Sequence, residues 1–287
     1  MRGHAAAVAE FWERGFVLIR GVFGRDMIDP AQRALKKIYP SAARYFNNPM
    51  EFAHLTKTKF SGISYYPFPD WALNRLPVHA PLVSILESIL ETGQIDCYKV
   101  ELWAKYAGTV DYAQPHHRDY ENHSLVVPRE DHLMPQITCF LFLSDVTEHD
   151  APTKLVPVSV TKDIPLGVAR VPMGELFDDE VAAVGPAGSV LFYRTDVFHR
   201  ASNFSTPGRS RFTMLMDYKC RGCAWQGKMA WPDRALSPGW VESIVRMSPR
   251  ERDLFGWPPI GSIYWNNQTL EDVAKRYPGI DLSAYKT

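Results

Sequence analysis

The stretch "GPAGSVLFYRTDVFHRASN" (residues 185–203) combines a glycine-containing turn, a run of apolar and aromatic residues, and a histidine. The turn residues, and the β-branched and aromatic side chains that follow them, predict a buried strand over "GSVLFYRT". His199 comes just after this strand, where its side chain can reach a site shared with a neighbouring strand. The stretch therefore predicts a β core with a functional histidine at one strand end.

Four further runs have the same character as this strand. No long helical pattern separates them, so they favour an antiparallel sandwich or barrel over a parallel sheet. Gly, Pro, Asp and Asn punctuate them, as expected of turns between short strands. The runs are "YKVELWAKY" (98–106), "QITCFLFLS" (136–144), "TKLVPVSV" (153–160) and "RFTMLMDY" (211–218).

Helical patterns lie on both sides of this β region. Before it, "PLVSILESILETG" (81–93) has a helical apolar stripe and a stop at Gly93. After it, "SPRERDLF" (248–255) contains a capping box, and "TLEDVAKRYPG" (269–279) predicts a helix capped by Thr269. We find no internal repeat or linker. We therefore expect one domain over 1–287, with a helical part at about 1–95, a β core at about 96–220 and a helical tail at about 221–287.

The composition excludes several classes of protein. Of the 287 residues, 46% are apolar and 22% charged, which is typical of a soluble globular protein. The formal net charge is zero, which argues against binding to nucleic acid or to an anionic membrane. There is no signal-peptide core and no run of about 18 apolar residues, so we expect a cytoplasmic protein. Four cysteines are too few for a disulfide framework, and Cys220 and Cys223 receive no function.

The segment "PHHRDY" (115–120) places two histidines just before an aspartate. Side chains alternate along a strand, so His117 and Asp119 would share one face, and His116 and Arg118 the other. An imidazole and a carboxylate on one inward face can bind a divalent ion together. His116 has only a cation two positions further on. We therefore predict that His117, and not His116, is a metal ligand.

His199 is the candidate for a third ligand. Two histidines and one carboxylate form the facial triad of non-haem Fe(II) oxygenases, which leaves three coordination positions open. 2-Oxoglutarate can fill two of these positions and O2 the third. The far carboxylate of 2-oxoglutarate needs a cation, and arginine can bind a carboxylate through two nitrogens. Arg209 and Arg211 share a strand face, so both are candidates.

In their order along the chain, these motifs resemble the phytanoyl-CoA dioxygenase family of Fe(II)/2-oxoglutarate oxygenases. The resemblance covers about residues 10–218 and implies a double-stranded β-helix, a cupin-like jelly roll, with flanking helices. Val158 and Val160 depart from the family's usual glycine and histidine. The motifs are "EFWERGFVLIRGVF" (10–23), "QPHHRDY" (114–120), "DAPTKLVPVSV" (150–160), the stretch 185–203 and "NFSTPGRSRF" (203–212).

The resemblance also implies roles for individual residues. His117, Asp119 and His199 would hold Fe(II), and the spacing from Asn203 favours Arg209 over Arg211 as the partner of 2-oxoglutarate. Ala201 stands where the family usually has Ser or Thr, so Ser202 and Ser210 are candidates for a hydroxyl contact to 2-oxoglutarate. The implied reaction is hydroxylation of a small molecule, such as a natural-product or amino-acid-derived intermediate, with release of succinate and CO2.

Two other functions fit the same fold. One is a cupin-type isomerase or hydrolase that uses its metal as a Lewis acid, and the other is a non-catalytic binding protein. The arginine pair argues against the first, and the complete His-Asp-His set argues against the second. The aromatic segment "GISYYPFPDW" (62–71) has two interpretations, a lid over the metal or packing of the helical layer onto the barrel.

Overall fold

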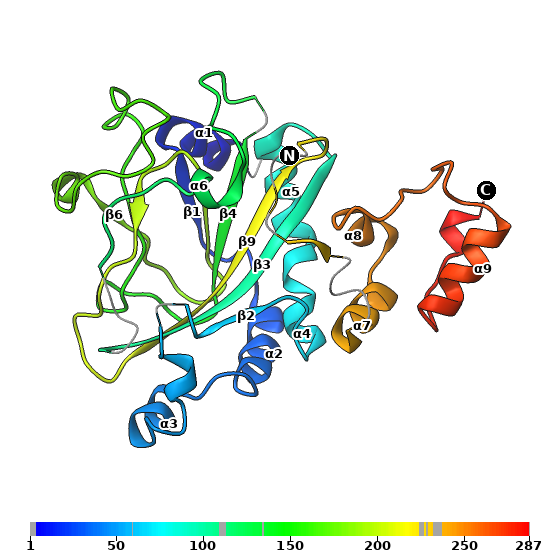
Figure 1. Cartoon of the computed structure of the whole chain (residues 1–287), viewed down its shortest axis with the longest axis horizontal. Helices are drawn as coiled ribbons and strands as arrows, with labels where there is room; N and C mark the ends of the chain where they lie inside the picture. Colours follow the sequence, from blue (N-terminus) through cyan, green and yellow to red (C-terminus); the bar gives the residue numbers. More distant parts are fainter. Residues whose placement is uncertain are drawn as a thin grey trace.

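Two antiparallel sheets form the centre of the molecule (Figure 1). This computed structural model describes residues 4–58, 60–108, 113–133, 135–223, 227, 229–231 and 237–286. The larger sheet has the order β1-β7-β4-β9-β3-β2, and the smaller sheet has the order β6-β5-β8. The strands are β1 (Phe16–Ile19), β2 (Ile63–Tyr65), β3 (Ile95–Tyr106), β4 (Gln136–Phe142), β5 (Lys154–Leu155), β6 (Val181–Ala182), β7 (Val190–Arg194), β8 (His199–Arg200) and β9 (Ser210–Cys220).

The path of the chain between the sheets defines the fold. From β4 onward the chain passes to the smaller sheet for β5 and β6, returns for β7, crosses again for β8 and returns for β9. The predicted double-stranded β-helix, or jelly roll, is therefore confirmed. The strands predicted over 98–106, 136–144 and 211–218 appear as β3, β4 and β9, whereas the run 153–160 contributes only the two residues of β5.

The two faces of the larger sheet differ in chemistry. On β9, Met214 and Met216 belong to the main apolar cluster, together with Leu102 of β3 and many residues of the helices. Thr213 and Asp217, which flank this pair along β9, project to the opposite face, as strand alternation requires. Both are buried. The interior of the barrel is therefore partly polar, and this polar interior is where a site can be built.

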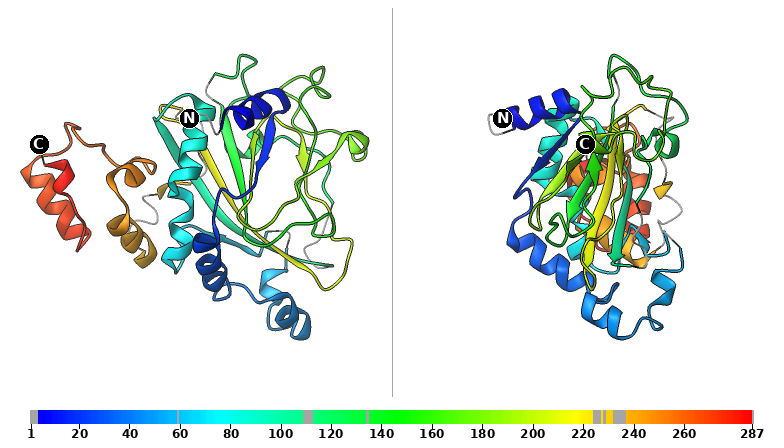
Figure 2. Two further views of the ribbon diagram at one scale, coloured as in Figure 1. Left: turned by 180° about the vertical axis from the view of Figure 1, so that it is seen from behind. Right: turned by 90° about the vertical axis from the view of Figure 1, so that its left-hand side faces the viewer.

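Helices cover the apolar face of the larger sheet. Figure 1 shows α2, α4 and α5 along one side of it, and Figure 2 shows α7, α8 and α9 extending beyond α5, away from the smaller sheet. The helices are α1 (Ala5–Arg14), α2 (Arg25–Leu35), α3 (Ala42–Asn47), α4 (Trp71–Asn74), α5 (Ala80–Leu90), α6 (Tyr120–His123), α7 (Pro238–Arg246), α8 (Pro249–Asp253) and α9 (Asn267–Arg276).

The helix boundaries confirm some predicted signals and correct others. The capping box of Ser248 and Glu251 is present at the start of α8. Helix α5 ends before Glu91, which takes the left-handed conformation at φ 53°, so the predicted stop at Gly93 is two residues too late. Helix α9 is capped by Asn266, whose side chain accepts a hydrogen bond from the Thr269 N–H, so Thr269 lies inside the helix and is not its cap.

The aromatic segment 62–71 packs against the C-terminal helices. Tyr66 and Phe68 are almost fully buried, and the Tyr66 ring stacks on Phe255 and meets Trp240 edge-on. The structure thus supports the packing interpretation for Tyr66 and Phe68, and the lid over the metal stays a prediction. In addition, β1 and β2 join the larger sheet, so the N-terminal part is less purely helical than expected.

Two further findings concern helix length and the cysteines. None of the helices in the described ranges is long and apolar enough to cross a bilayer. All four cysteines, including Cys220 and Cys223, are free thiols.

Candidate metal centre

His117, Asp119 and His199 converge at one end of the smaller sheet. Each offers one ligand atom, and these atoms all lie within 4.8 Å of one another. His117 and His199 face each other across an antiparallel bridge. Asp119 follows at the start of α6, with the helical dihedral angles φ −76° and ψ −11°. His116 points elsewhere, with its Nε2 3.2 Å from a carboxylate oxygen of Glu180.

The geometry of the three side chains suits a divalent metal. The Nε2 atom of His199 lies 3.3 Å from Asp119 Oδ2, and that of His117 lies 3.7 Å from Asp119 Oδ1. Each histidine has its other ring nitrogen, Nδ1, 3.1 Å from the carbonyl oxygen two residues before it, Pro115 and Val197 respectively. A donated Nδ1–H fixes the tautomer, so both Nε2 lone pairs are aimed at the space beside Asp119.

The electrostatics of the cluster favour a cation there. Burial raises the pKa of Asp119, but His199, His123 and His117 outweigh burial and hold this pKa well below its usual range. Burial, together with nearby His199, lowers the pKa of His117 to about 4. Burial also opposes a charge on His199, but the Asp119 carboxylate outweighs it and raises the His199 pKa. The cluster thus offers a carboxylate and a neutral imidazole, the forms in which these side chains bind metals.

Arg118 fixes the segment that carries His117 and Asp119. Its guanidinium donates to four backbone carbonyls, those of Asp196 at 2.8 Å, Pro165 at 2.6 Å, Val168 at 3.0 Å and Ile164 at 3.3 Å. It also lies over the Phe198 ring, with its central carbon 4.1 Å from the ring centre. From the sequence, Arg118 was expected only to lie on the strand face opposite His117 and Asp119. Its role in joining its own segment to two loops, 164–168 and the turn at Asp196, depends on contacts far apart in sequence.

Tyr193 was also missed by the sequence analysis. It lies on β7, and its hydroxyl donates to Asp119 Oδ2 at 2.9 Å. Burial, reinforced by Asp119 and Asp217, raises the Tyr193 pKa well above its usual range, so the phenol keeps its proton and remains a donor. The alternation along "LFYR" indicated which face Tyr193 would take. Nothing in the sequence indicated that this face meets Asp119.

The structure separates the two candidate arginines. The Arg209 side chain is 41% exposed and forms a two-nitrogen ion pair with Asp150. Arg211 is buried, on the inner face of β9, and its guanidinium donates to the Ala151 carbonyl. Its cross-strand partner is Lys105, which is buried as well. Two cations therefore lie side by side on the interior wall, and Arg209 is not one of them.

The two candidate serines also differ. Ser202 is buried, and its hydroxyl donates to the Pro152 carbonyl at 2.6 Å. Arg211 binds the preceding carbonyl, that of Ala151, so Ser202 and Arg211 meet at the same loop. Ser210 alternates with Arg211 along β9 and takes the opposite face of the strand.

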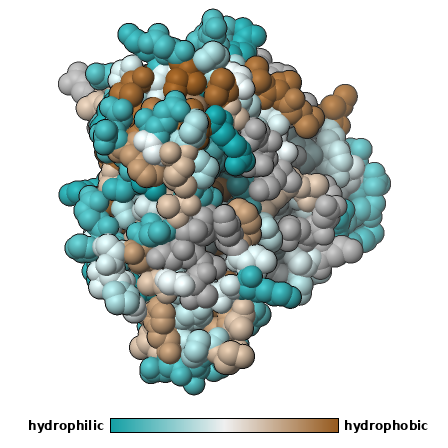
Figure 3. All heavy atoms as spheres, turned by 60° about the vertical axis from the view of Figure 1, so that its left-hand side comes forward, coloured by the Kyte–Doolittle hydropathy of each residue, from teal (hydrophilic) through white to brown (hydrophobic). Residues whose placement is uncertain are grey.

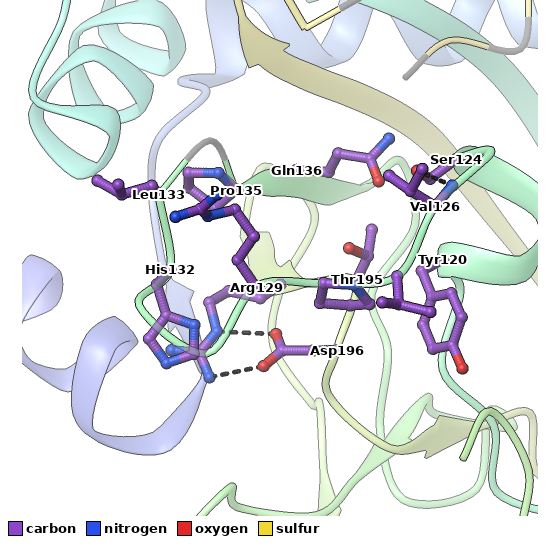
Figure 4. A pocket seen from close by; sticks show the side chains of 13 residues that line it. Tyr120, Ser124, Val126, Arg129, His132, Leu133, Pro135, Gln136, Thr195 and Asp196 are labelled. Carbon is purple, nitrogen blue, oxygen red and sulfur yellow. Dashed lines mark hydrogen bonds and ion pairs between the residues drawn. The ribbon is translucent and has the colours of Figure 1, made fainter. Parts of the chain in front are cut away.

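A narrow cleft opens beside α6 (Figure 4). It lies between the segment that carries Ser124 and Val126 and the turn that carries Thr195 and Asp196. Its volume is about 30 Å³. Organic ligands usually occupy pockets of about 300–1,000 Å³, so the rim must move before this cleft could admit one.

The rim of this cleft is partly apolar. Val126, Val127 and Leu133 line the cleft and are at least half exposed. Figure 3 shows the face of the molecule that includes the β6 side, with apolar side chains gathered along its upper edge.

The chain is thus a jelly roll whose His117, Asp119 and His199 side chains form a group that could hold a metal ion. The sequence profile of the phytanoyl-CoA dioxygenase (PhyH) family matches residues 11–213. The chain belongs to this family, whose members are Fe(II)- and 2-oxoglutarate-dependent enzymes acting on small molecules. No curated protein matches the chain in sequence.

Several solved structures share the fold. The 2-oxoglutarate-dependent carbocyclase SnoK of nogalamycin biosynthesis aligns with TM-score 0.55 and 17% identity, covering 82% of this chain and 91% of its own. The epimerase SnoN, in complex with Fe3+, 2-oxoglutarate and a nogalamycin, has TM-score 0.54 and 16% identity, with coverages of 78% and 86%. HygX from Streptomyces hygroscopicus, with nickel and 2-oxoglutarate bound, has TM-score 0.54 and 14% identity, with coverages of 76% and 87%.

Proposed function

We propose that this protein is an Fe(II)- and 2-oxoglutarate-dependent dioxygenase that hydroxylates a small organic molecule. The observation that carries the proposal is the convergence of His117, Asp119 and His199, with both imidazole Nε2 atoms aimed at the carboxylate. Family membership supports the oxygenase over a cupin-type hydrolase or a binding protein. The three side chains would hold Fe(II), and bound Fe(II) and 2-oxoglutarate would together supply the oxidation of a C–H bond by O2.

Arg211 is our proposed anchor for the far carboxylate of 2-oxoglutarate. Its position on the inner face of β9 supports this role, because a buried guanidinium loses little of its attraction for a carboxylate to solvent. Lys105 adds a second positive charge on the adjacent strand. The Ser202 hydroxyl contacts the same loop, 151–152, that the Arg211 guanidinium contacts. Arg209 already pairs with Asp150 near the surface, so we assign it no contact with 2-oxoglutarate.

Hydroxylation is the outcome we propose for the substrate. In related halogenating enzymes a small residue replaces the carboxylate ligand and leaves room for a halide. Here Asp119 occupies that place. The neighbouring structures include an epimerase and a carbocyclase, so the placement of the substrate must decide the outcome on this fold. The apolar rim formed by Val126, Val127 and Leu133 favours a substrate with an apolar portion.

Mass spectrometry of the product tests the proposed reaction. Candidate small molecules are first screened for stimulation of succinate release, and a positive compound is then incubated under ¹⁸O2 in chloride buffer. We expect the product to gain one labelled oxygen atom. Loss of two hydrogens, or a change of configuration without a gain in mass, would contradict hydroxylation. A chlorinated product would contradict the role of Asp119.

A further inference from the structure

One side of the cleft in Figure 4 is formed by the loop between α6 and β4. We call residues 125–133 of this loop the rim loop. Its side chains Val126, Val127 and Leu133 line the cleft, and each of them is at least half exposed. Apolar side chains that gather at the surface mark binding sites more often than scattered ones do. The rim loop therefore presents a solvent-facing apolar surface that a ligand can bury.

The rim loop is fixed at its base and lightly attached elsewhere. The Gln136 side chain donates to the His123 carbonyl at 2.7 Å, and both residues are buried, so the two ends of the loop are held together. Within the described part of the chain, the hydrogen bonds of the loop itself reach no further than Ser124. A segment with local, exposed hydrogen bonds opens at a low cost in free energy. The loop can thus move while its base stays in place.

The far part of the rim loop rests on helix α1. The centre of the His132 ring lies 5.9 Å from that of the Trp12 ring. The central carbon of the Arg194 guanidinium lies 5.6 Å from the centre of the same Trp12 ring. A tilted ring contact of this kind contributes little compared with the burial of an apolar ligand. The contact with Trp12 therefore defines a resting position that the loop can leave.

The cleft lies directly beside the proposed metal centre. Tyr120, which lines the cleft, follows the proposed ligand Asp119 in the chain. Arg194, which also lines it, follows Tyr193, whose hydroxyl donates to Asp119. The cleft volume of about 30 Å³ is enough for a water molecule but not for an organic molecule. A substrate that approaches the centre from this side therefore requires the rim loop to move.

The charges at the cleft select the kind of ligand. Its two arginines are each paired with a carboxylate, Arg194 with Asp196 and Arg129 with Asp131. Burial lowers the pKa of His132, which favours its neutral ring. The charges of these lining residues are therefore balanced within the protein, and they do not favour an ionic ligand. An uncharged apolar group fits this lining best.

We propose that the rim loop binds the uncharged apolar portion of the substrate, and that Val126, Val127 and Leu133 close over it beside the metal centre. The loop swings about its base at His123 and Gln136, and the burial of its apolar side chains against the substrate drives the closure. These three side chains thereby determine which small molecules the protein accepts. This inference rests on the proposed dioxygenase function.

Binding of N-phenyl-1-naphthylamine, an uncharged aromatic dye that fluoresces in apolar surroundings, tests the proposal. The dye is titrated into the full-length chain with Co(II) and 2-oxoglutarate present, and we expect saturable binding. Val127→Ser and Leu133→Ser should each weaken dye affinity by roughly 3–10-fold, because each removes apolar area that the dye buries. Leu125→Ser is the matched control and should leave the affinity unchanged. Leu125 is 88% exposed in the same loop but does not line the cleft.

Limited trypsin digestion measures the closure of the loop. The Arg129 side chain is 58% exposed in the rim loop, so we expect trypsin to cut after it in the dye-free chain. Arg129→Gln removes this cleavage and identifies the fragment. Saturating dye should slow the cleavage several-fold in the wild-type chain and in Leu125→Ser. Circular dichroism of every variant checks that the fold is retained.

Four outcomes would overturn the proposal: no dye binding to the wild-type chain, wild-type affinity in both Val127→Ser and Leu133→Ser, an equal loss in Leu125→Ser, or dye that binds without slowing cleavage after Arg129. The visible absorption of Fe(II) chelated by 2-oxoglutarate, which every rim-loop variant should keep, tests the metal centre separately. Its absence from the wild-type chain would remove the proposed function. Its presence together with any of the four outcomes would remove only the role of the rim loop.

Discussion

His117 and His199 exchange both backbone hydrogen bonds, with N–H···O distances of 2.9 Å and 3.0 Å. With these two backbone hydrogen bonds in place, the centres of the two imidazole rings lie 4.5 Å apart. The positions of both rings are therefore set by the backbone of the smaller sheet, and the side chain of Asp119 completes the set from the start of α6. A site fixed in this way needs little rearrangement when a metal binds.

The first prediction concerns the three proposed ligands. His117→Ala, Asp119→Ala and His199→Ala should each lose bound iron and Fe(II)-dependent activity, because two remaining side chains cannot hold the ion firmly. Anaerobic reconstitution followed by iron analysis measures the loss. His116→Gln is the control and should retain iron, since His116 contacts Glu180 on the other face. Iron lost from the His116 variant but kept in the His117 variant would reverse the assignment.

The second prediction distinguishes the two arginines. Arg211→Gln should weaken 2-oxoglutarate binding to the anaerobic Fe(II) protein by about 2–5 kcal/mol, because a buried carboxylate would lose its charged partner. Arg209→Gln is the matched control and should change the affinity little. Calorimetric titration of 2-oxoglutarate measures both. A loss only in Arg209→Gln would make Arg209 the anchor, and no loss in either variant would contradict the proposed 2-oxoglutarate site.

Much of the fold was predictable from local patterns. Runs rich in β-branched and aromatic residues, with turn residues between them, predicted β3, β4, β7 and β9, because such side chains fit the pleated surface of a buried sheet. Strand parity also selected His117 over His116 as the neighbour of Asp119, although Asp119 itself lies at the start of α6. Asp119 has helical dihedral angles, so strand alternation alone does not explain why its side chain meets His117.

The rest of the site depends on contacts that local patterns do not encode. Spacing from Asn203 favoured Arg209, but Asp150, which is far away in sequence, pairs with Arg209 near the surface. Tyr193 and Asp119 meet only because β7 lies next to the metal centre in the folded barrel. A single sequence shows which face of a strand a residue takes, but it does not show what lies opposite that face.

The third prediction concerns the C-terminal helices. Arg252 is almost fully buried, and its guanidinium donates to the carbonyls of Ile244 at 2.9 Å and Asp281 at 3.0 Å. It thereby joins the end of α7 to the C-terminal segment. Arg252→Met should lower the free energy of unfolding by about 2–4 kcal/mol, since buried carbonyls lose charged donors. Denaturant unfolding measures this change.

Metal binding provides the contrast for this variant. Because Arg252 lies outside the barrel interior, Arg252→Met should bind Co(II) as tightly as the wild-type chain. Arg246→Gln, which changes an exposed arginine of α7 paired only with Glu242 among the ion pairs of the described residues, is a suitable surface control for stability. Equal unfolding free energies for Arg252→Met and the wild-type chain would contradict the proposed joining role.

Anaerobic absorption spectroscopy tests the central claim most directly. Fe(II) that is held by the protein and chelated by 2-oxoglutarate gives a visible charge-transfer absorption that neither component gives alone. We predict that this absorption appears in the wild-type chain with one equivalent of Fe(II) and 2-oxoglutarate, and that Asp119→Ala abolishes it. A folded wild-type chain that shows no such absorption, or an Asp119→Ala variant that shows it undiminished, would contradict an Fe(II)/2-oxoglutarate centre at His117, Asp119 and His199.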